Sequence, residues 1–488
     1  MSTAVLEPKA DVQSVGHFIG GEWQSAKDAY DHHDPGRLNE VVVRLARGTP
    51  EDVAQAVRAA HAAFPAWRDM SPAERAQLMM VATEAMSATA EELAPLMVRE
   101  HGGMLWEAQT DFGLGAGVTQ HTLSLVEDFF KPTIIDEDAA KIMIERMPRG
   151  VCVGIIPWNM PLVLAMMKIA PALATGNTMV IKPSPFAAGA RTRALAAVAA
   201  KLPAGVLNVV LGEGDVGAAL ISHPLVRKVG FTGGTETAKH VMTGAAQGIK
   251  NVTLELGGND PAVMLDDADL EMTLERMLKG IYTRSGQICF AVKRVYVPKN
   301  RYQEFTDALV ERVSKYTVGH GLSDGVDFGP LNNKAQYEKV LGFIAGADSD
   351  GARVLELGNK HEPDNWDNGY YILPHVVLDA KHESSIVSCE QFGPIIPIIS
   401  YDDEAQAREW ANDCEYGLGA SVWTADSDRG FEFARRLEAG SSFINTHSFD
   451  SLDPRMPFGG IKQSGSGREF GEAGLKEYVE EHSLRQQK

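Results

Sequence analysis

Cysteine is scarce in this sequence: only four are found among 488 residues, at positions 152, 289, 389 and 414. None forms a CxxC pair or has the spacing of metal ligands, and the 14 histidines form no HExxH motif. The sequence therefore predicts neither a disulfide framework nor a metal site. Unpaired thiols persist in a reducing compartment, so we expect a cytoplasmic protein.

Long apolar runs and an excess of positive charge are also missing. No stretch of about 18 uninterrupted apolar residues exists, and the first residues, MSTAVLEPKADVQ, contain no apolar signal core. Lysine and arginine total 46 against 65 aspartates and glutamates, so the net charge is −19. We therefore expect no membrane partner, and the acidic excess argues against nucleic acid.

The N-terminal part carries the start signals of two helices. In TPEDVAQAVRAAHAAF, Thr49 has the N-cap position, Pro50 the first helical position, and apolar residues follow at helical spacing. SPAERAQLMMVATEAM repeats this signal at Ser71. Further on, KIMIERMP alternates apolar and polar residues, which indicates a protruding antiparallel strand.

From residue 150 onward, short β-branched runs alternate with Ala-rich helical stretches. The runs are GVCVGIIP, NTMVIKPS, GVLNVVLG, VRKVGFTG and NVTLELGG. Strands that are apolar at nearly every position are typical of a parallel sheet covered by helices on both faces. A second such pattern follows Asp266, with KRVYVPK and YYILPHVVLDA as its clearest strands. The sequence thus predicts two α/β units.

Two glycine-rich turns compete as the phosphate-binding loop of a nucleotide site. GEGDVG, residues 212–217, fits the GxGxxG pattern between a strand and a helix. VGFTGGTETAKH also runs from a strand through Gly233 and Gly234 into a helix that begins near Thr235, where free N–H groups favour a phosphate. Spacing alone does not choose between them.

Three polar residues occupy unusual places, and each has an ordinary alternative role. Asn159 in IIPWNMP is either the N-cap of the next helix or an amide donor in a cleft. Glu255 lies between two leucines at a strand end, so it either pairs with a buried cation or is a base with a raised pKa. A cysteine such as Cys289 is most often a small buried apolar residue, as we expect for Cys152, Cys389 and Cys414.

Taken together, these stretches resemble the aldehyde dehydrogenase superfamily. IIPWNMP resembles its oxyanion loop, VIKPSP its adenosine-ribose motif, FTGGTETAK its phosphate loop, LELGGN its catalytic-glutamate signature and GQICF its nucleophile signature. EQFGPI and PFGGIKQSGSGREFG continue the series. The seven motifs keep their order over about residues 15–485, which makes the resemblance specific.

The resemblance implies an α/β, aldehyde dehydrogenase-like fold in three parts. These are a Rossmann-like NAD(P)-binding domain (residues 1–129 and 149–256), an α/β catalytic domain (257–465) and a small β oligomerisation arm (130–148 and 466–488). It therefore also implies a homo-oligomer, either a dimer or a tetramer. It selects residues 233–235 as the phosphate loop and leaves GEGDVG as a structural turn.

The resemblance also assigns chemical roles. Cys289 would attack the aldehyde carbonyl and later release the acid from a thioester. The Asn159 amide and the Cys289 N–H would stabilise the alkoxide. Glu255 would deprotonate the hydrolytic water, and Lys168 and Glu469 match positions proposed as a proton exit route.

The resemblance further implies NAD as the cofactor. The implied contacts are Ile155, Ile156, Pro157, Trp158, Lys182, Ser184, Pro185, Gly214, Phe231, Thr232, Gly233, Gly234, Thr235, Leu256, Gly257, Glu390 and Phe392. Among them, Lys182 would hold the adenosine ribose and Glu390 the nicotinamide ribose. Pro185 departs from the family pattern, because many NAD-preferring members have a glutamate there. The absence of this glutamate carboxylate removes a repulsion against a 2′-phosphate, so NADP is also possible.

The substrate is expected to be an apolar aldehyde. Met160, Leu164 and Met167 share one face at helical spacing, which is either plain core or the wall of the aldehyde tunnel. Ile288, Phe290 and Phe458 complete the candidate substrate-binding set. None of these is charged, so we expect aromatic or medium-chain aldehydes, while His447 or Arg455 could add a polar contact at the mouth.

Three other functions remain open at this point. A CoA-acylating semialdehyde dehydrogenase would resolve the thioester with CoA, but it would not need the base Glu255. A cysteine hydrolase could use the same thiol and base without a cofactor. A catalytically silent binding protein is disfavoured, because Asn159, Glu255 and Cys289 are all present.

Overall fold

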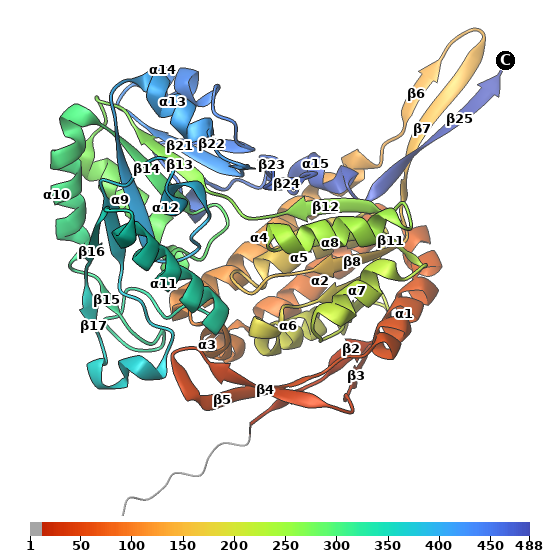
Figure 1. Cartoon of the computed structure of the whole chain (residues 1–488). Helices are drawn as coiled ribbons and strands as arrows, with labels where there is room; N and C mark the ends of the chain where they lie inside the picture. The colour runs from red at the N-terminus through yellow and green to blue at the C-terminus, as the bar shows by residue number, and fades with distance from the viewer. Residues whose placement is uncertain (1–11) are drawn as a thin grey trace, which may run out of the picture.

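The computed structural model describes residues 12–488. It contains two large β-sheets flanked by helices and a β-arm that projects away from them (Figure 1). Residues 1–11, which include most of the segment searched for a signal core and the start of the predicted cofactor domain, lie outside the described part. No helix within residues 12–488 is both long and apolar enough to cross a membrane.

The first sheet has eight strands in the order β24-β12-β11-β8-β9-β10-β2-β3. Their bounds are Gly465–Ser466 (β24), Asn251–Glu255 (β12), Val226–Thr232 (β11), Val151–Ile155 (β8), Thr178–Lys182 (β9), Leu207–Val209 (β10), His17–Ile19 (β2) and Glu22–Gln24 (β3). The central five, from β12 to β10, are all parallel. These five strands are the five β-branched runs from which the parallel sheet was predicted.

Helices cover both faces of this sheet. They are Pro50–Asp69 (α1), Pro72–Ser87 (α2), Ala90–His101 (α3), Leu105–Phe129 (α4), Val163–Ala174 (α5), Gly189–Ala199 (α6), Gly214–Ser222 (α7) and Thr235–Ala246 (α8), with the 3₁₀ turn Pro185–Ala187 (η1). Val151 and Val153 of β8 pack in one apolar cluster with α1, α7 and α8, whereas Cys152 packs on the other side with α2 to α6. This alternation confirms the prediction of a parallel sheet covered by helices on both faces.

The predicted helix starts are confirmed. Thr49 and Ser71 cap α1 and α2, each in a capping box with the acidic residue three positions later. Of the two glycine-rich turns, GEGDVG leads into α7 at Gly214 and FTGGTETAK leads into α8 at Thr235.

The second sheet has seven strands in the order β16-β18-β19-β14-β13-β21-β22. Their bounds are Arg353–Glu356 (β16), His375–Leu378 (β18), Ile395–Tyr401 (β19), Val292–Pro298 (β14), Asp260–Met264 (β13), Gly419–Trp423 (β21) and Ser441–Ile444 (β22). All neighbours are parallel except β16 and β18. KRVYVPK forms most of β14, as predicted, while only the second half of YYILPHVVLDA forms a strand.

The remaining elements complete this second unit and the connections. The helices are Leu270–Tyr282 (α9), Tyr302–Val313 (α10), Lys334–Ser349 (α11), Ser385–Ser388 (α12), Glu404–Asn412 (α13) and Ser427–Ala434 (α14). The 3₁₀ turns are Thr283–Gly286 (η2), Lys299–Arg301 (η3), Pro363–Asn368 (η4) and Phe449–Ser451 (η5). Small sheets join Ser14–Val15 (β1), Arg37–Ala46 (β5) and Ala29–Asp34 (β4), Thr317–Val318 (β15) with Asn359–Lys360 (β17), and Tyr416–Gly417 (β20) with Ile461–Lys462 (β23).

The arm is a three-stranded antiparallel sheet in the order β25-β7-β6, formed by Val479–Gln487 (β25), Ala140–Pro148 (β7) and Thr133–Asp136 (β6). Figure 1 shows it extending from the body of the molecule. Helix Gly471–Lys476 (α15) connects β25 to the rest. KIMIERMP lies in β7 and is therefore the protruding strand that its alternation predicted. We propose that the domains divide along these three sheets.

Candidate active site

The carboxyl ends of four parallel strands meet at one edge of the first sheet. There β8 ends at Ile155, β9 at Lys182, β11 at Thr232 and β12 at Glu255. Ligands of open α/β sheets bind beyond the carboxyl ends of the strands. The predicted motifs lie at the ends of these strands or directly after them. The parallel sheet therefore brings the motifs together at one edge.

Cys289 lies between η2 and β14, opposite this edge. The segment before it is strained, because the non-glycine residues Arg284 and Ser285 both have positive φ, at 58° and 56°. Two side-chain bonds hold it: the Arg284 N–H donates to Glu107 Oε1 at 2.7 Å, and Ser285 Oγ donates to the Gly329 carbonyl at 2.8 Å. The half-buried Cys289 therefore sits on a fixed loop.

Two cavities meet at Cys289. One, the cofactor cleft, has a volume of about 440 Å³ and lies along the strand ends. The other, the tunnel, has a volume of about 210 Å³ and lies between α4, α5 and the segment after β22. Asn159 and Cys289 line both. A molecule in either cavity can thus reach the same sulfur atom.

The cofactor cleft gathers nearly all the predicted cofactor residues. Those that line it are Ile155, Ile156, Pro157, Trp158, Lys182, Ser184, Pro185, Phe231, Thr232, Gly233, Gly234, Leu256, Gly257, Glu390 and Phe392. Gly214 and Thr235 do not: Gly214 begins α7, and Thr235 Oγ1 donates to the Gln463 carbonyl at 3.4 Å.

Sequence reasoning missed four residues of this lining, namely Phe186, Thr237, Gln336 and Lys339. Phe186 directly follows KPSP, and Thr237 lies two residues after Thr235 in α8, so extending each motif by one turn would have included them. Gln336 and Lys339 lie on α11, far along the chain, and no sequence signal connects them to the cleft.

The residues of the cleft fit a dinucleotide. Helix α8 begins after Gly234 with no side chain capping its N–H groups, which leaves them free for a phosphate. A Cβ at Gly257 would lie 2.3 Å from Glu390 Oε2, so a glycine is required where this carboxylate enters the cleft. Burial lowers the pKa of Lys182 to about 8, so an anionic ligand nearby would stabilise its charge.

Asn159 is positioned as a donor and is not a helix cap. Helix α5 begins only at Val163, and its first N–H groups, of Leu162 and Val163, donate to Asp111 at 2.8 Å each. The Asn159 amide instead donates to the Gln287 carbonyl at 3.0 Å. Because an amide NH₂ has two hydrogens, one remains for a ligand at Cys289.

Glu255 lies at the end of β12 and is only 3% exposed. Neither of its carboxylate oxygens has a hydrogen-bond partner within residues 12–488. The alternative of a direct buried ion pair for Glu255 is therefore wrong. Burial, followed by repulsion from Glu469, raises the pKa of Glu255 well above its ordinary value, and Lys168 opposes the rise. A carboxyl group in this state can accept a proton near neutral pH.

Lys168 and Glu469 form a buried ion pair behind Glu255. Lys168 Nζ lies 2.6 Å from Glu469 Oε1 and 2.6 Å from Thr232 Oγ1. The predicted pair is thus brought together next to Glu255. Within residues 12–488, no group of three or more His, Cys, Asp or Glu side chains is arranged to hold a metal ion.

The tunnel contains all six predicted substrate residues, which are Met160, Leu164, Met167, Ile288, Phe290 and Phe458. Its further lining, missed from the sequence, is Gly113, Leu114, Gly117, Val118, Val163, Phe449, Leu452, Pro454 and Phe470. Apart from Asn159, every lining side chain is apolar except the Cys289 thiol. A Cβ at Gly113 or Gly117 would meet nothing within 4 Å, so these glycines of α4 leave space open.

Two expectations need correction, one for His447 and one for Cys389. His447 is fully buried and cannot act at the mouth: its Nε2 lies 2.8 Å from the Phe290 carbonyl and its Nδ1 2.8 Å from Ser421 Oγ. Arg455 is exposed and pairs with Asp453. Cys389 is also exposed rather than buried, because it directly follows the short helix α12 at the surface.

The thiol of Cys289 is weakly acidic in this setting. Burial is the main cause that raises its pKa to about 12, and the carboxylates of Asp260, Glu390 and Glu255 add to the rise. Lys293 is the largest opposing influence.

Comparison with known proteins identifies the family. The chain matches the Aldehyde dehydrogenase family over residues 23–484. It is 35% identical over 478 residues to betaine aldehyde dehydrogenase of Brucella anthropi, covering 97% of this chain and 96% of the relative. The crystal structure of betaine aldehyde dehydrogenase from Staphylococcus aureus in complex with NAD⁺ has a TM-score of 0.92 at 32% identity, covering 96% of this chain and 94% of that one.

A second structural neighbour is described as an E. coli NADP dependent enzyme. Its TM-score is 0.92 at 35% identity, and the match covers 97% of this chain and 98% of the neighbour. Together with the cleft that fits a dinucleotide and the family match along nearly the whole chain, these similarities establish the activity. The chain belongs to the aldehyde dehydrogenase family and is an oxidoreductase that oxidises an aldehyde with NAD or NADP as hydride acceptor.

Proposed function

We propose that the enzyme converts an apolar aldehyde, aromatic or of medium chain length, into its carboxylic acid through a thioester on Cys289. The observation that carries this proposal is the meeting of the two cavities at Cys289. Cys289 lines both the cofactor cleft, which also contains polar residues such as Lys182 and Glu390, and the apolar tunnel.

The first step is nucleophilic attack. The Cys289 thiolate forms a C–S bond with the aldehyde carbon, and the carbonyl oxygen becomes an alkoxide. The free hydrogen of the Asn159 amide and the Cys289 N–H, which has no acceptor within residues 12–488, stabilise this oxygen. NAD or NADP, held by the residues that line the cofactor cleft, would supply the acceptor for the hydride that leaves the substrate carbon.

The acyl group then remains on Cys289 as a thioester, and hydrolysis needs a base. Glu255 removes a proton from water, the oxygen attacks the acyl carbon, and the C–S bond breaks to return the thiolate. Its unpartnered oxygens and raised pKa support this role. The Lys168–Glu469 pair beside it is a suitable next acceptor for the proton.

The substrate class follows from the tunnel. Four phenylalanines and the two methionines Met160 and Met167 provide an adaptable apolar wall, and no charged side chain of residues 12–488 lines it. A phosphate or carboxylate on the substrate would therefore be desolvated without a partner. Benzaldehyde derivatives and hexanal fit this chemistry.

Betaine aldehyde is a second candidate, because the Brucella anthropi relative and the Staphylococcus aureus structure are betaine aldehyde dehydrogenases. One observation favours it: aromatic faces attract a quaternary ammonium group, and Phe290 lies within 6.0 Å, centroid to centroid, of both Phe449 and Phe458. The lack of any carboxylate in the tunnel argues the other way. We therefore rank apolar aldehydes first.

A CoA-acylating reaction is not favoured, since CoA would attack the thioester without the base that Glu255 provides. Cofactor choice depends on the adenosine end of the cleft, where Pro185 lines the wall and provides no carboxylate to repel a 2′-phosphate. We propose that NAD and NADP are both accepted.

The test is a measurement of kcat/KM for hexanal, benzaldehyde, betaine aldehyde and succinic semialdehyde, each with NAD and with NADP. The proposal expects an apolar aldehyde to rank first and turnover to proceed without CoA. If either charged aldehyde exceeds both apolar ones, the tunnel does not select apolar substrates.

Assembly and location are also proposals. The outer strand β25 of the arm is exposed from Glu480 onward. Leu484 of β25 and Ile134 of β6 present apolar side chains at the surface of the arm. Such an edge is usually paired or covered, so we propose a homodimer or homotetramer. Light scattering at micromolar concentration checks this, and a monomer would contradict it. The four free thiols support a cytoplasmic location.

A further inference from the structure

Four consecutive carbonyl groups around the nucleophile each accept a hydrogen bond from a side chain. The Gln287 carbonyl accepts from the Asn159 amide at 3.0 Å. The Phe290 carbonyl lies 2.8 Å from His447 Nε2. The two between them, of Ile288 and Cys289, both accept from Lys293 Nζ, at 2.9 Å and 2.6 Å. One buried lysine therefore holds the centre of the nucleophile loop.

The bond to Ile288 has a consequence for catalysis. In a trans peptide the C=O of one residue and the N–H of the next point in opposite directions. Because Lys293 draws the Ile288 carbonyl toward itself, the Cys289 N–H points away from Lys293. This N–H is one of the two donors assigned to the alkoxide, so Lys293 sets its direction without touching the substrate.

Lys293 also brings positive charge to a site crowded with carboxylates. Its side chain is about 3% exposed, and Nζ lies 3.5 Å from Glu390 Oε1. The charged groups that face the Cys289 thiol are Lys293, Asp260, Glu390 and Glu255. Lys293 is the cation in this set, so its removal would leave the thiolate facing negative charges alone.

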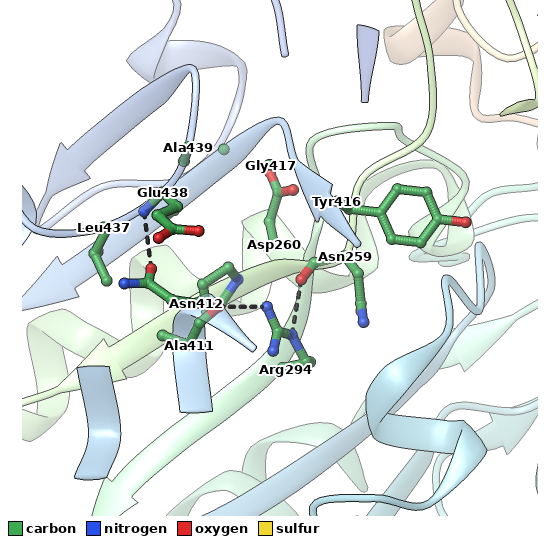
Figure 2. A pocket seen from close by; sticks show the side chains of 13 residues that line it. Asn259, Asp260, Arg294, Ala411, Asn412, Tyr416, Gly417, Leu437, Glu438 and Ala439 are labelled. Carbon is green, nitrogen blue, oxygen red and sulfur yellow. Dashed lines mark hydrogen bonds between the residues drawn. The ribbon is translucent and has the colours of Figure 1, made fainter. Parts of the chain in front are cut away.

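The backbone of Lys293 is fixed by its neighbour. Arg294, the next residue in β14, points to the other side of the sheet, and donates to the carbonyls of Asn259 at 2.8 Å and Ala411 at 2.9 Å. Figure 2 shows the Arg294 guanidinium between these two residues. The Lys293 carbonyl itself accepts from Gln391 Nε2 at 3.3 Å. The Lys293 ammonium group therefore extends from a backbone that is held in place.

We infer that Lys293 is a positioning residue of the reaction, which aims the Cys289 N–H at the alkoxide and supports the thiolate with its charge. Through Glu390 it also links the nucleophile loop to the cofactor cleft. This inference rests on the proposed role of Cys289 but not on the identity of the aldehyde.

The experiment compares Lys293→Met and Lys293→Arg with the wild type in two measurements. The first is the rate of Cys289 alkylation by iodoacetamide at pH 8 without cofactor, followed on the Cys289 peptide by mass spectrometry so that exposed Cys389 does not interfere. We expect this rate to fall about tenfold in Lys293→Met, because a smaller fraction of the thiol is ionised, and to stay near wild type in Lys293→Arg. The second measurement is steady-state kinetics, with kcat lowered about 10- to 100-fold in Lys293→Met and KM for the aldehyde little changed.

Lys228→Met is the matched control. Lys228 is also a buried lysine paired with a glutamate, Glu477, but it contacts neither the cleft nor the tunnel. It should leave the alkylation rate of Cys289 at pH 8 unchanged. If Lys293→Met does not fold, Lys293→Gln, which keeps a donor and removes the charge, provides the rate measurement.

A wild-type alkylation rate at pH 8 together with wild-type kcat in folded Lys293→Met or Lys293→Gln would overturn the inference. If Cys289 proves not to be the nucleophile, Cys289→Ala retains activity, and that failure of the proposed function is seen separately from the alkylation result.

Discussion

The cofactor cleft and the tunnel meet at one sulfur atom, yet they are built from different kinds of sequence. The cleft is formed by the turns that follow β8, β9, β11 and β12, where glycine, proline and a few polar residues lie close together in the chain. The tunnel is formed by faces of α4 and α5 and by the segment around Phe449 and Phe458.

The difference follows from the ligands. A dinucleotide is polar and constant, so it is held by backbone groups and by side chains whose type and order are restricted. An apolar substrate needs only a wall of the right shape, which many combinations of side chains provide. We therefore infer that the residues of the cleft indicate the type of reaction and that the tunnel selects the substrate.

The largest effect is expected where the two cavities join. Cys289→Ala should abolish dehydrogenase turnover, by about 10⁴-fold or more, because no other group can carry the acyl intermediate. The exposed Cys389 gives a matched control, and Cys389→Ser should keep full activity. Substantial NADH formation by Cys289→Ala, measured at 340 nm, would show that another residue is the nucleophile.

A smaller loss is expected at the other residue that both cavities share. Asn159→Ala removes one alkoxide donor and should lower kcat about 10²- to 10³-fold with both NAD and NADP. The same change also removes the bond to the Gln287 carbonyl, so the alkylation rate of Cys289 should be measured in parallel. A fall in kcat no larger than the fall in alkylation rate would assign Asn159 to loop positioning alone.

The tunnel can be altered without touching the cleft. Gly117→Leu fills open space in α4 and should lower kcat/KM for hexanal about 10- to 100-fold, while the smaller acetaldehyde loses less. Gly342→Leu, at an equally open position of α11, is the control for adding a leucine to a helix. Equal losses for both aldehydes in Gly117→Leu would mean that the substrate does not pass Gly117.

The cleft can be altered in the same way. Pro185→Glu should lower kcat/KM for NADP about tenfold more than for NAD, through repulsion of the 2′-phosphate. Aldehyde ranking should not change, because Pro185 lies outside the tunnel. Equal effects on the two cofactors would place the adenosine ribose away from Pro185.

The smallest effect concerns stability. The pKa of Glu255 is raised in the folded protein, so above about pH 4.3 the folded state keeps a proton that the unfolded state has released. The free energy of unfolding therefore falls as pH rises above this value. Glu255→Gln removes this pH-dependent loss of stability, because glutamine does not ionise. Its apparent Tm should therefore exceed that of the wild type more at pH 8.5 than at pH 5.5, and a difference independent of pH would contradict the raised pKa.

Much of the cleft could be predicted from the sequence, because its residues lie within a few positions of glycine-rich turns at strand ends. Lys339 could not, since it comes from α11 and only tertiary packing brings it to the cleft. The parallel strands were predicted for a similar reason: their nearly continuous apolar runs report burial on both faces.

The tunnel was predicted only where it touches a motif. Gly113 and Gly117 contribute to the tunnel by having no side chain, and no local sequence pattern marks such a glycine as functional. Asp111 caps α5 from α4, and this long-range contact, which the sequence around Asn159 does not indicate, excludes the N-cap alternative for Asn159. His447 is likewise explained only by the fold, which buries it against the nucleophile loop.

The central claim is that Cys289 carries the acyl group between the two cavities. It is tested most directly in Glu255→Gln, in which thioester hydrolysis should be slowed about 10²- to 10⁴-fold. With hexanal and NAD, this variant should release a burst of NADH close to one per active site, and peptide mass spectrometry should find a hexanoyl group on Cys289 only when both compounds are present. A full burst without acylated Cys289, or steady turnover near the wild-type rate, would contradict the account.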